Sequence, residues 1–312
     1  DALLVQIKAL GATVRKSLPK YGYARIETTD AVASRIRVLP GVKSVGEPLP
    51  SVLNKTNTSQ GDVAHQAADA RTAFGVTGKG VKVGVISDSA KHLKSLQDSG
   101  DLPNGVTVLA GYEGGGIGMP DTGEGTGMVE IVYGLAPGAQ LYFATGAPTY
   151  FELADAIDAL EKAGCRIIVD DLSWDTEPAL QESEAAKAVN DFVRGGGLYF
   201  SCAINYGNKA AGTSCVWEGD FTGEAQTVTL EGVEYEANLF SSTDDGVEVT
   251  SGTLAYLQWA DDFSSARYGY RLVVLFPNDD IDFGTVPNDL PNAPFQMYKS
   301  SSLKGATLMI LK

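Results

Sequence analysis

The stretch Val81-Lys-Val-Gly-Val-Ile-Ser-Asp-Ser89 decides the fold of this chain. It opens with a short, nearly continuous apolar run, which is typical of a strand buried on both faces of a parallel sheet. Further strands are expected at 140–144, 166–169 and 198–201, with helices at 125–133, 150–163 and 183–194 between them. Strands that alternate with helices indicate an α/β domain with a doubly wound parallel sheet, over residues 76–215.

The first 50 residues read as a separate small α/β domain. A helix is expected at 2–10, ending at Gly11, then strands at 13–15 and 21–27 around a turn at Pro19. A second helix would run from Thr29 or Asp30 to Val38, followed by a short strand at 42–45. Residues 51–75 are expected to form a polar linker and one amphipathic helix at 62–74.

The sequence pattern changes after Cys215, because apolar residues no longer recur at the spacing of a helix. Alternating segments are separated by Gly, Asp, Asn and Pro, which predicts an antiparallel β-sandwich over 216–312. The expected strands lie at 226–230, 234–240, 253–259, 271–276 and 307–311.

Charge and cysteine content exclude several classes of protein. The net charge is −15, from 24 basic and 39 acidic side chains, and this argues against a nucleic-acid partner, whose phosphates need clustered Lys and Arg. No apolar run is long enough to span a bilayer. The three cysteines match no zinc motif. Whether Cys202 and Cys215 pair or stay free is left open.

Three polar residues follow predicted strands or open a predicted helix. Asp88 ends the buried strand, where a carboxylate can orient a catalytic base or cap a helix. Glu124 opens a helix at a Gly-rich turn, where the helix dipole stabilises it; as a base it would need a raised pKa. Asn205 follows another strand end, where its amide can donate to an oxyanion or simply form a turn.

The order of these segments resembles the subtilisin-like serine peptidases, the subtilases. Residues 81–89 resemble their aspartate segment, and Glu124-Gly-Thr-Gly-Met-Val129 resembles their histidine segment, with Glu in place of His. Leu172-Ser173-Trp174 resembles the substrate-binding strand, and Ser201-Cys-Ala-Ile-Asn205 the oxyanion segment. Residues 1–50, with Leu39-Pro-Gly-Val-Lys-Ser-Val45, resemble the propeptide. The segment Leu257-Gln-Trp-Ala-Asp-Asp-Phe263 is similar to part of a β-domain inserted in some large bacterial subtilases.

The resemblance implies a secreted protein with a subtilisin-like fold that acts on peptides or proteins. It implies that Asp88 orients Glu124, that Glu124 is the base, and that Asn205 is the oxyanion donor. Ser173 and Trp174 would bind the substrate. The sedolisins, a more distant relative, use a Ser-Glu-Asp set, but this chain has Met128 where they place the Asp. His65 and His92 are expected to be structural or surface residues.

A nucleophile is the missing part of the resemblance. Only Gly212-Thr213-Ser214 resembles the family's serine segment. It follows Asn205 by fewer residues along the chain than the family's serine segment does. The serine is expected beyond Lys312, so the chain alone is expected to be inactive. A secreted pseudopeptidase, with a structural, protein-binding or self-assembling role, is the alternative. A complementary chain or self-association would then cover the sheet edge.

Two further readings concern ligands. Subtilases often bind calcium, and Asp261-Asp262 and Asp279-Asp280 are candidate ligands by charge. A nucleotide-binding protein is disfavoured, because Gly114-Gly-Gly-Ile-Gly118 lacks the required glycine spacing.

Overall fold

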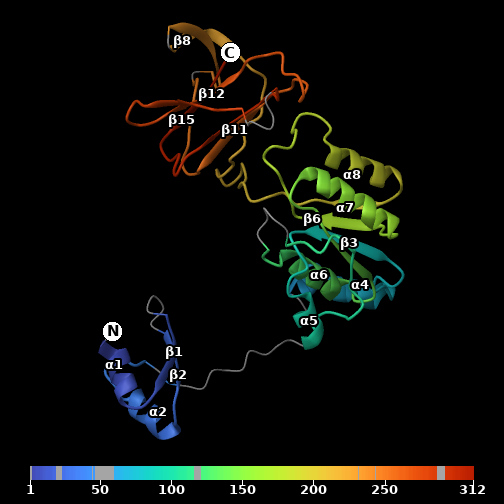
Figure 1. Cartoon of the computed structure of the whole chain (residues 1–312), viewed down its shortest axis with the longest axis vertical. Coiled ribbons are helices and arrows are strands. Elements are labelled where there is room, and N and C mark those ends of the chain that lie inside the picture. Colours follow the sequence, from blue (N-terminus) through green and yellow to red (C-terminus); the bar gives the residue numbers. More distant parts are fainter. Residues whose placement is uncertain are drawn as a thin grey trace. The chain divides into compact units, whose positions relative to one another are not determined.

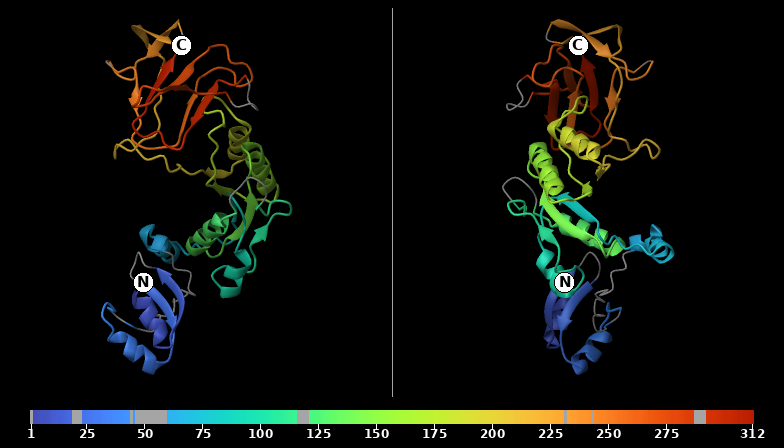
Figure 2. Two further views of the ribbon diagram at one scale, coloured as in Figure 1. Left: turned by 60° about the vertical axis from the view of Figure 1, so that its left-hand side comes forward. Right: turned by 90° about the vertical axis from the view of Figure 1, so that its right-hand side faces the viewer.

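A computed structural model describes residues 2–18, 23–43, 45, 60–115, 121–230, 232–242, 244–286 and 292–312. The chain divides into two compact units, Asp1–Leu53 and Asn54–Lys312. Figure 1 shows the elements of both units, and Figure 2 gives two further views.

The first unit pairs two helices with an antiparallel hairpin. Helices α1 (Ala2–Ala9) and α2 (Asp30–Arg37) accompany strands β1 (Thr13–Leu18) and β2 (Tyr23–Glu27). Ile7, Ala12 and Ile36 form its buried core. The strand expected at 42–45 is wrong, since Val42, Lys43 and Val45 lie outside strands. The expected turn at Pro19 falls outside the described residues.

A five-stranded parallel sheet begins the second unit and confirms the predicted α/β class. Its order is β4-β5-β3-β6-β7, and all its pairs are parallel. The strands are β3 (Lys82–Ser87), β4 (Thr107–Val108), β5 (Gln140–Thr145), β6 (Ile167–Asp170) and β7 (Leu198–Phe200). Strand β3 lies at the centre and is buried from Val83 to Ser87, as its apolar sequence predicts.

Helices cover both faces of this sheet (Figure 1). Helix α6 (Glu124–Leu135) packs Val129 against Val85 and Phe143. Helices α7 (Tyr150–Lys162) and α8 (Glu184–Arg194) pack Leu160 and Phe192 against Ile86 and Ile168 on the other face. A methyl group at Gly84 would lie 2.8 Å from Leu160 Cδ1, so α7 packs closely only because that residue is glycine.

The segment before the sheet differs from the expectation of one helix at 62–74. It forms two helices, α3 (Gln60–Ala64) and α4 (Ala67–Phe74), because Gln66 adopts a left-handed φ of 54° between them. Asp62 in α3 is buried and accepts two hydrogen bonds from Arg71 of α4, which hold the pair together. Helix α5 (Leu93–Ser99) and the short strand β4 were not predicted.

Residues beyond about 220 form two antiparallel sheets. The larger sheet has the order β13-β12-β15-β9-β8, with β10 also pairing to β15, and the smaller sheet pairs β11 with β14. Ala255, Leu272, Val274, Leu303 and Ala306 form a buried cluster between them. The strands are β8 (Gly223–Leu230), β9 (Val233–Asn238), β10 (Val247–Glu248), β11 (Leu254–Gln258), β12 (Arg271–Leu275), β13 (Ile281–Phe283), β14 (Phe295–Lys299) and β15 (Thr307–Leu311).

One glutamine side chain ties this β part to the segment that follows β6. Gln258 Nε2 donates to the carbonyls of Asp175 and Glu177 at 3.1 and 3.0 Å, and its Oε1 accepts from the N–H of Ala179 at 2.8 Å. Gln181 Nε2 also donates to the carbonyl of Asp261 at 2.7 Å. Residues of the β part therefore hold the segment 175–181 in place.

Candidate functional site

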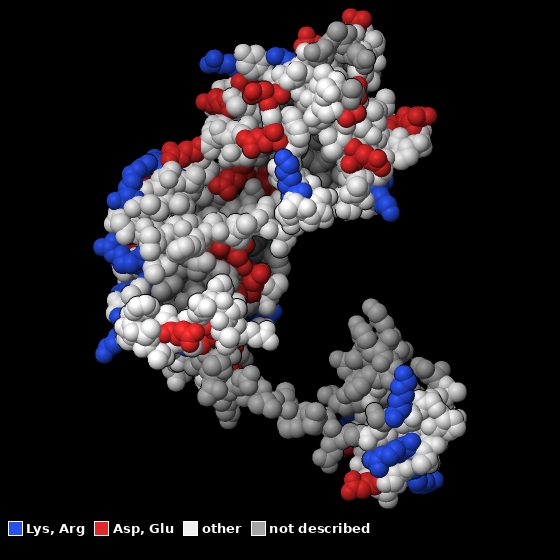
Figure 3. Space-filling view, turned by 180° about the vertical axis from the view of Figure 1, so that it is seen from behind, with Lys and Arg blue, Asp and Glu red and all other residues white. Residues whose placement is uncertain are grey.

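The parallel sheet carries opposite charges at its two ends. Basic residues lie where strands begin or helices end, at Lys82, Lys162, Arg166 and Arg194. Carboxyl groups lie at the carboxyl ends of the strands, at Asp88, Asp170 and Asp171, and at Glu124 on the first turn of α6. On the face drawn in Figure 3, Lys and Arg side chains gather along one flank of the part that holds the parallel sheet, and most of its Asp and Glu side chains lie off that flank. The acidic end is where open parallel sheets bind ligands.

Asp88 is held as an anion by the N-terminus of α6. Its Oδ2 accepts from Thr122 N at 2.7 Å, Thr122 Oγ1 at 2.6 Å and Gly123 N at 3.0 Å. Its Oδ1 accepts from Ser89 N at 2.6 Å and Gly125 N at 3.1 Å. Burial alone would raise the pKa of Asp88, but these hydrogen bonds outweigh burial and lower it. Asp88 therefore ties β3 to α6 as a cap supplied from another element.

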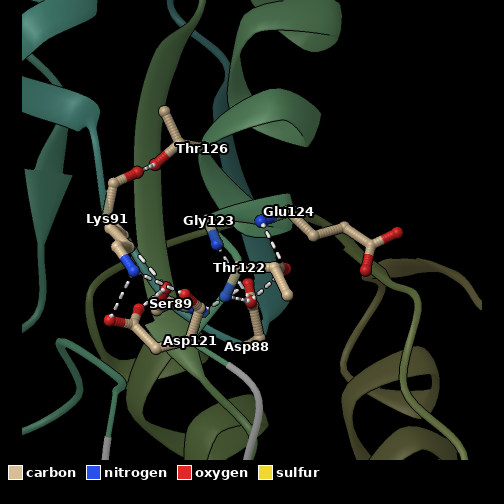
Figure 4. A network of polar contacts seen from close by, with 8 residues as sticks. All are labelled: Asp88, Ser89, Lys91, Asp121, Thr122, Gly123, Glu124 and Thr126. Carbon is tan, nitrogen blue, oxygen red and sulfur yellow. Dashed lines mark hydrogen bonds and ion pairs between the residues drawn. The ribbon is translucent and has the colours of Figure 1, made fainter. Parts of the chain in front are cut away.

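A second layer of contacts supports the loop around Asp88 (Figure 4). Ser89 Oγ donates to Asp121 Oδ1 at 2.6 Å, and Lys91 Nζ donates to the Asp121 carbonyl at 2.8 Å. Thr126 Oγ1 donates to the Lys91 carbonyl at 2.7 Å. The residues after β3 are thus bound to both sides of the α6 N-terminus, which fixes the direction in which the first turn of α6 faces.

Glu124 pairs with Asp171, not with the carboxylate of Asp88. Its side chain points away from Asp88 in Figure 4. The neighbouring charge of Asp171 is the main cause that raises the pKa of Glu124, followed by burial, the charge of Asp88 and a hydrogen bond with Asp171. Burial is the main cause that raises the pKa of Asp171. Two adjacent carboxyl groups with raised pKa values hold a proton between them more readily than either does alone.

Buried polar groups surround the carboxyl of Asp171. Its Oδ1 and the Oγ of Ser87 are both buried, and the Ser87 hydroxyl beside it lowers the pKa of Asp171, although burial raises that pKa more. Asp170, the preceding residue, is 3% exposed and accepts from Ser201 Oγ at 3.1 Å. Burial is the largest cause that raises the pKa of Asp170. The carboxyl groups at the end of β6 therefore have raised pKa values, whereas that of Asp88 at the end of β3 has a lowered one.

The remaining predicted site residues are less closely associated with the carboxyl groups of Asp88 and Glu124. Trp174 is partly buried, and its indole N–H donates to the Pro148 carbonyl at 2.7 Å. Ser173 is exposed. Asn205 is exposed in the loop after β7, next to Ile204, whose φ of 52° is unusual for a β-branched residue. No contact of the Asn205 side chain with Asp88 or Glu124 is seen among the described residues.

The described residues contain no serine hydroxyl bonded to Glu124. Ser214 is exposed, and its hydroxyl donates only to the carbonyl of Val216, at 3.2 Å. Cys165, Cys202 and Cys215 are all free thiols. Cys165 is buried, and burial raises its pKa to about 11, so it is not a thiolate at neutral pH.

Asp261 and Asp262, one of the acidic pairs expected as candidate calcium ligands, accept hydrogen bonds from main-chain groups nearby in the sequence. Asp261 Oδ2 accepts from the N–H groups of Arg267 and Tyr268, and Asp262 Oδ1 accepts from Ser264 N. Over the described ranges, no three His, Cys, Asp or Glu side chains are grouped so as to hold a metal ion. Within the same ranges, no helix is both long and apolar enough to cross a membrane.

Comparison with protein-family models gave no match, and no curated protein sequence matched the chain.

Sequence reasoning singled out Glu124 but missed Asp171. The available signal was the pair Asp170-Asp171 directly after a predicted strand, because strand ends of a parallel sheet converge at one edge.

Proposed function

We propose that Asp88, Glu124 and Asp171 form the acid–base side of a subtilisin-like serine peptidase site, in a secreted protein of that family. The observation that carries the proposal is the contrast between three neighbouring carboxyl groups. Asp88 has a lowered pKa, whereas Glu124 and Asp171 have raised ones. Carboxyl groups whose environments push their pKa values apart take different acid–base roles.

In this proposal Glu124 accepts the proton of an attacking hydroxyl, in place of a histidine. Its raised pKa brings it nearer to the range in which a base is efficient. Asp171 would hold the Glu124 carboxyl in place through their hydrogen bond and share its proton. Asp88 would keep the first turn of α6 in register and add a fixed negative charge. Asn205 would donate to the oxyanion, and Ser173 and Trp174 would line the path of the peptide.

The base can be tested without a serine nucleophile, by hydrolysis of an activated ester such as p-nitrophenyl acetate. Glu124→Gln should lose about tenfold or more of the rate that the folded chain adds over buffer, because general-base catalysis contributes roughly 100-fold or more. Glu130→Gln is the matched control, since Glu130 lies on the same helix and burial also raises its pKa. Equal rates for both variants would count against Glu124 as the base.

The chain by itself is expected not to form an acyl-enzyme. A fluorophosphonate probe should leave it unlabelled, because the hydroxyl of Ser214 donates to the carbonyl of Val216 and no base among the described residues contacts it. The control is Ser214→Ala. Labelling of the parent chain that disappears in this variant would identify Ser214 as a nucleophile and contradict the expectation.

A second candidate function, a protein-binding pseudopeptidase, is favoured by the edge strand β7. Leu198 and Phe200 of β7 are each 56% exposed. Their in-register neighbours on β6, Ile167 and Val169, are partly buried. The next neighbours, Val83 and Val85 on the central strand β3, are buried. An exposed apolar edge strand offers a template on which another chain can pair. Concentration-dependent light scattering that Phe200→Asp abolishes would support this function, and a monomer at all concentrations would count against self-association.

A further inference from the structure

The ammonium group of Lys312 lies among three aromatic rings of the β part. Its Nζ is 5.7 Å from the ring centre of Phe221, 5.2 Å from that of Tyr268 and 5.6 Å from that of Tyr270. No ion pair joins Lys312 to a carboxylate of the described residues. Its main chain exchanges two hydrogen bonds with Glu236, at 2.9 and 3.0 Å, so the side chain starts from a fixed point.

The three rings form an aromatic cage whose walls are held by neighbouring residues. Asp261 Oδ2 accepts from Tyr268 N at 2.7 Å and from Trp259 Nε1 at 3.2 Å. The Trp259 ring in turn packs edge-on against Tyr270, with centroids 5.5 Å apart. The rings of Phe221 and Tyr270 also pack together, with centroids 5.2 Å apart. The segment 257–263, which the proposed peptidase site does not use, thus positions two of the three cage rings.

A cage of ring faces attracts cations through the ring quadrupoles, and it favours cations that lose little hydration on entry. The primary ammonium of a lysine is strongly hydrated. A methylated ammonium is larger and more weakly hydrated, so it gains the same attraction at a smaller cost. Tyr268 is 56% exposed, which leaves the cage open to solvent on one side.

We propose that the cage of Phe221, Tyr268 and Tyr270 is a binding site for a methylated ammonium group, and that Lys312 is an intramolecular competitor for it. A trimethyllysine side chain and a choline headgroup both carry this chemistry. This site is independent of the carboxyl groups at the parallel sheet, so neither proposal depends on the other.

The test compares two replacements of Lys312 in the full chain. Lys312→Ala empties the cage, whereas Lys312→Met leaves an uncharged chain of similar length in it. Choline binding is followed by Trp fluorescence and calorimetry, with 3,3-dimethylbutan-1-ol as the neutral isostere of choline. Lys312→Ala should bind choline at least tenfold more tightly than the parent chain and Lys312→Met, and should not bind the isostere. Equal choline affinities for the two variants, or equal affinities for choline and its isostere, would overturn the proposal.

Variants of the cage check that binding occurs at these rings. In the Lys312→Ala background, Tyr268→Ala and Asp261→Asn should each weaken choline binding tenfold or more. Tyr268 is largely exposed, so its replacement leaves the fold intact, and an unchanged thermal unfolding midpoint verifies this. Choline binding that survives both changes would place the ligand elsewhere and refute the cage. A trimethyllysine peptide and phosphatidylcholine vesicles, each assayed separately, then identify which source of the group the cage accepts.

Discussion

The carboxylate of Asp88 accepts a hydrogen bond from the main-chain N–H of Gly125 at 3.1 Å, which joins the end of β3 to the first turn of α6. Four further donors, from Ser89, Thr122 and Gly123, complete the set. Because these donors all need an acceptor, the ionised form of Asp88 is part of the folded structure.

Replacement of Asp88 by Asn should destabilise the protein by about 2 kcal/mol, because charge-assisted hydrogen bonds are replaced by weaker ones and an amide N–H₂ meets N–H donors. Since the pKa of Asp88 is lowered in the folded state, its contribution is present above the ordinary Asp pKa and is lost as pH falls through the lowered value. Urea unfolding at pH 7 measures the loss. Asp98→Asn, on the exposed side of α5, should change stability by less than about 0.5 kcal/mol, and equal losses for both would contradict the role of Asp88.

Gly125 and Gly127 on α6 should respond oppositely to alanine. A Cβ on Gly125 would lie 2.3 Å from Phe143 Cε2 and 2.8 Å from the Ser89 carbonyl, so Gly125→Ala should cost about 2 kcal/mol or more. A Cβ on Gly127 meets nothing within 4 Å, so Gly127→Ala should stabilise the helix by about 0.5–1 kcal/mol. The thermal unfolding midpoints of the two variants, each compared with that of the parent chain, measure these opposite effects. An unchanged stability of Gly125→Ala would contradict the close packing of α6 on β5.

The Glu124–Asp171 pair should make the protein less stable as pH rises. Both groups have raised pKa values in the folded state, so the folded protein binds more protons than the unfolded chain between the ordinary carboxyl pKa and the raised values. The free energy of unfolding therefore falls with rising pH across that window. Asp171→Asn should flatten the slope, and carboxyl ¹³C shifts should show that the pKa of Glu124 falls in the same variant.

The exposed Asp158 of α7 provides the control for this titration. Asp158→Asn removes the same charge from the chain without touching the pair, so it should leave both the slope and the pKa of Glu124 unchanged. A pKa of Glu124 that does not respond to Asp171→Asn would show that the two carboxyl groups do not interact.

Removal of the Gln258 side chain should release the segment after β6. Gln258→Ala deletes the three hydrogen bonds to Asp175, Glu177 and Ala179, at a cost of about 2 kcal/mol. Exchange of the Ala179 amide hydrogen should become at least tenfold faster. Gln140→Ala, on an exposed position of β5, serves as the control. Unchanged protection at Ala179 would mean that other contacts fix this segment.

The sequence predicted the central part of the fold because its signals are local. The apolar run of β3 and the amphipathic periods of α7 and α8 each fix one element, and alternation of strands and helices then gives a parallel sheet. The break in the helix at 62–74 depends on the left-handed backbone of Gln66, which no residue pattern marks. The strands β13 and β14 are defined by their partners in the β part more than by their own sequences.

The candidate site was predicted only in part, for a related reason. Asp88 and Glu124 stand out because each follows or opens a recognisable element. Whether Glu124 pairs with Asp88 or with Asp171 depends on which direction a side chain takes from the first turn of α6. That direction is set by the hydrogen bonds between Asp88 and the backbone of residues 122–125, which exist only after folding.

The contacts of Gln258 have a consequence for the order in which the chain acquires its structure. Gln258 lies 83 and 81 positions along the chain from the carbonyls of Asp175 and Glu177 that it binds. Such distant contacts carry a large loop-closure entropy and form late. During synthesis, the segment after β6 therefore has no anchor on this side until β11 has been made and folded. A protein cut between the two parts could retain its parallel sheet while the backbone beside Asp171 remains mobile.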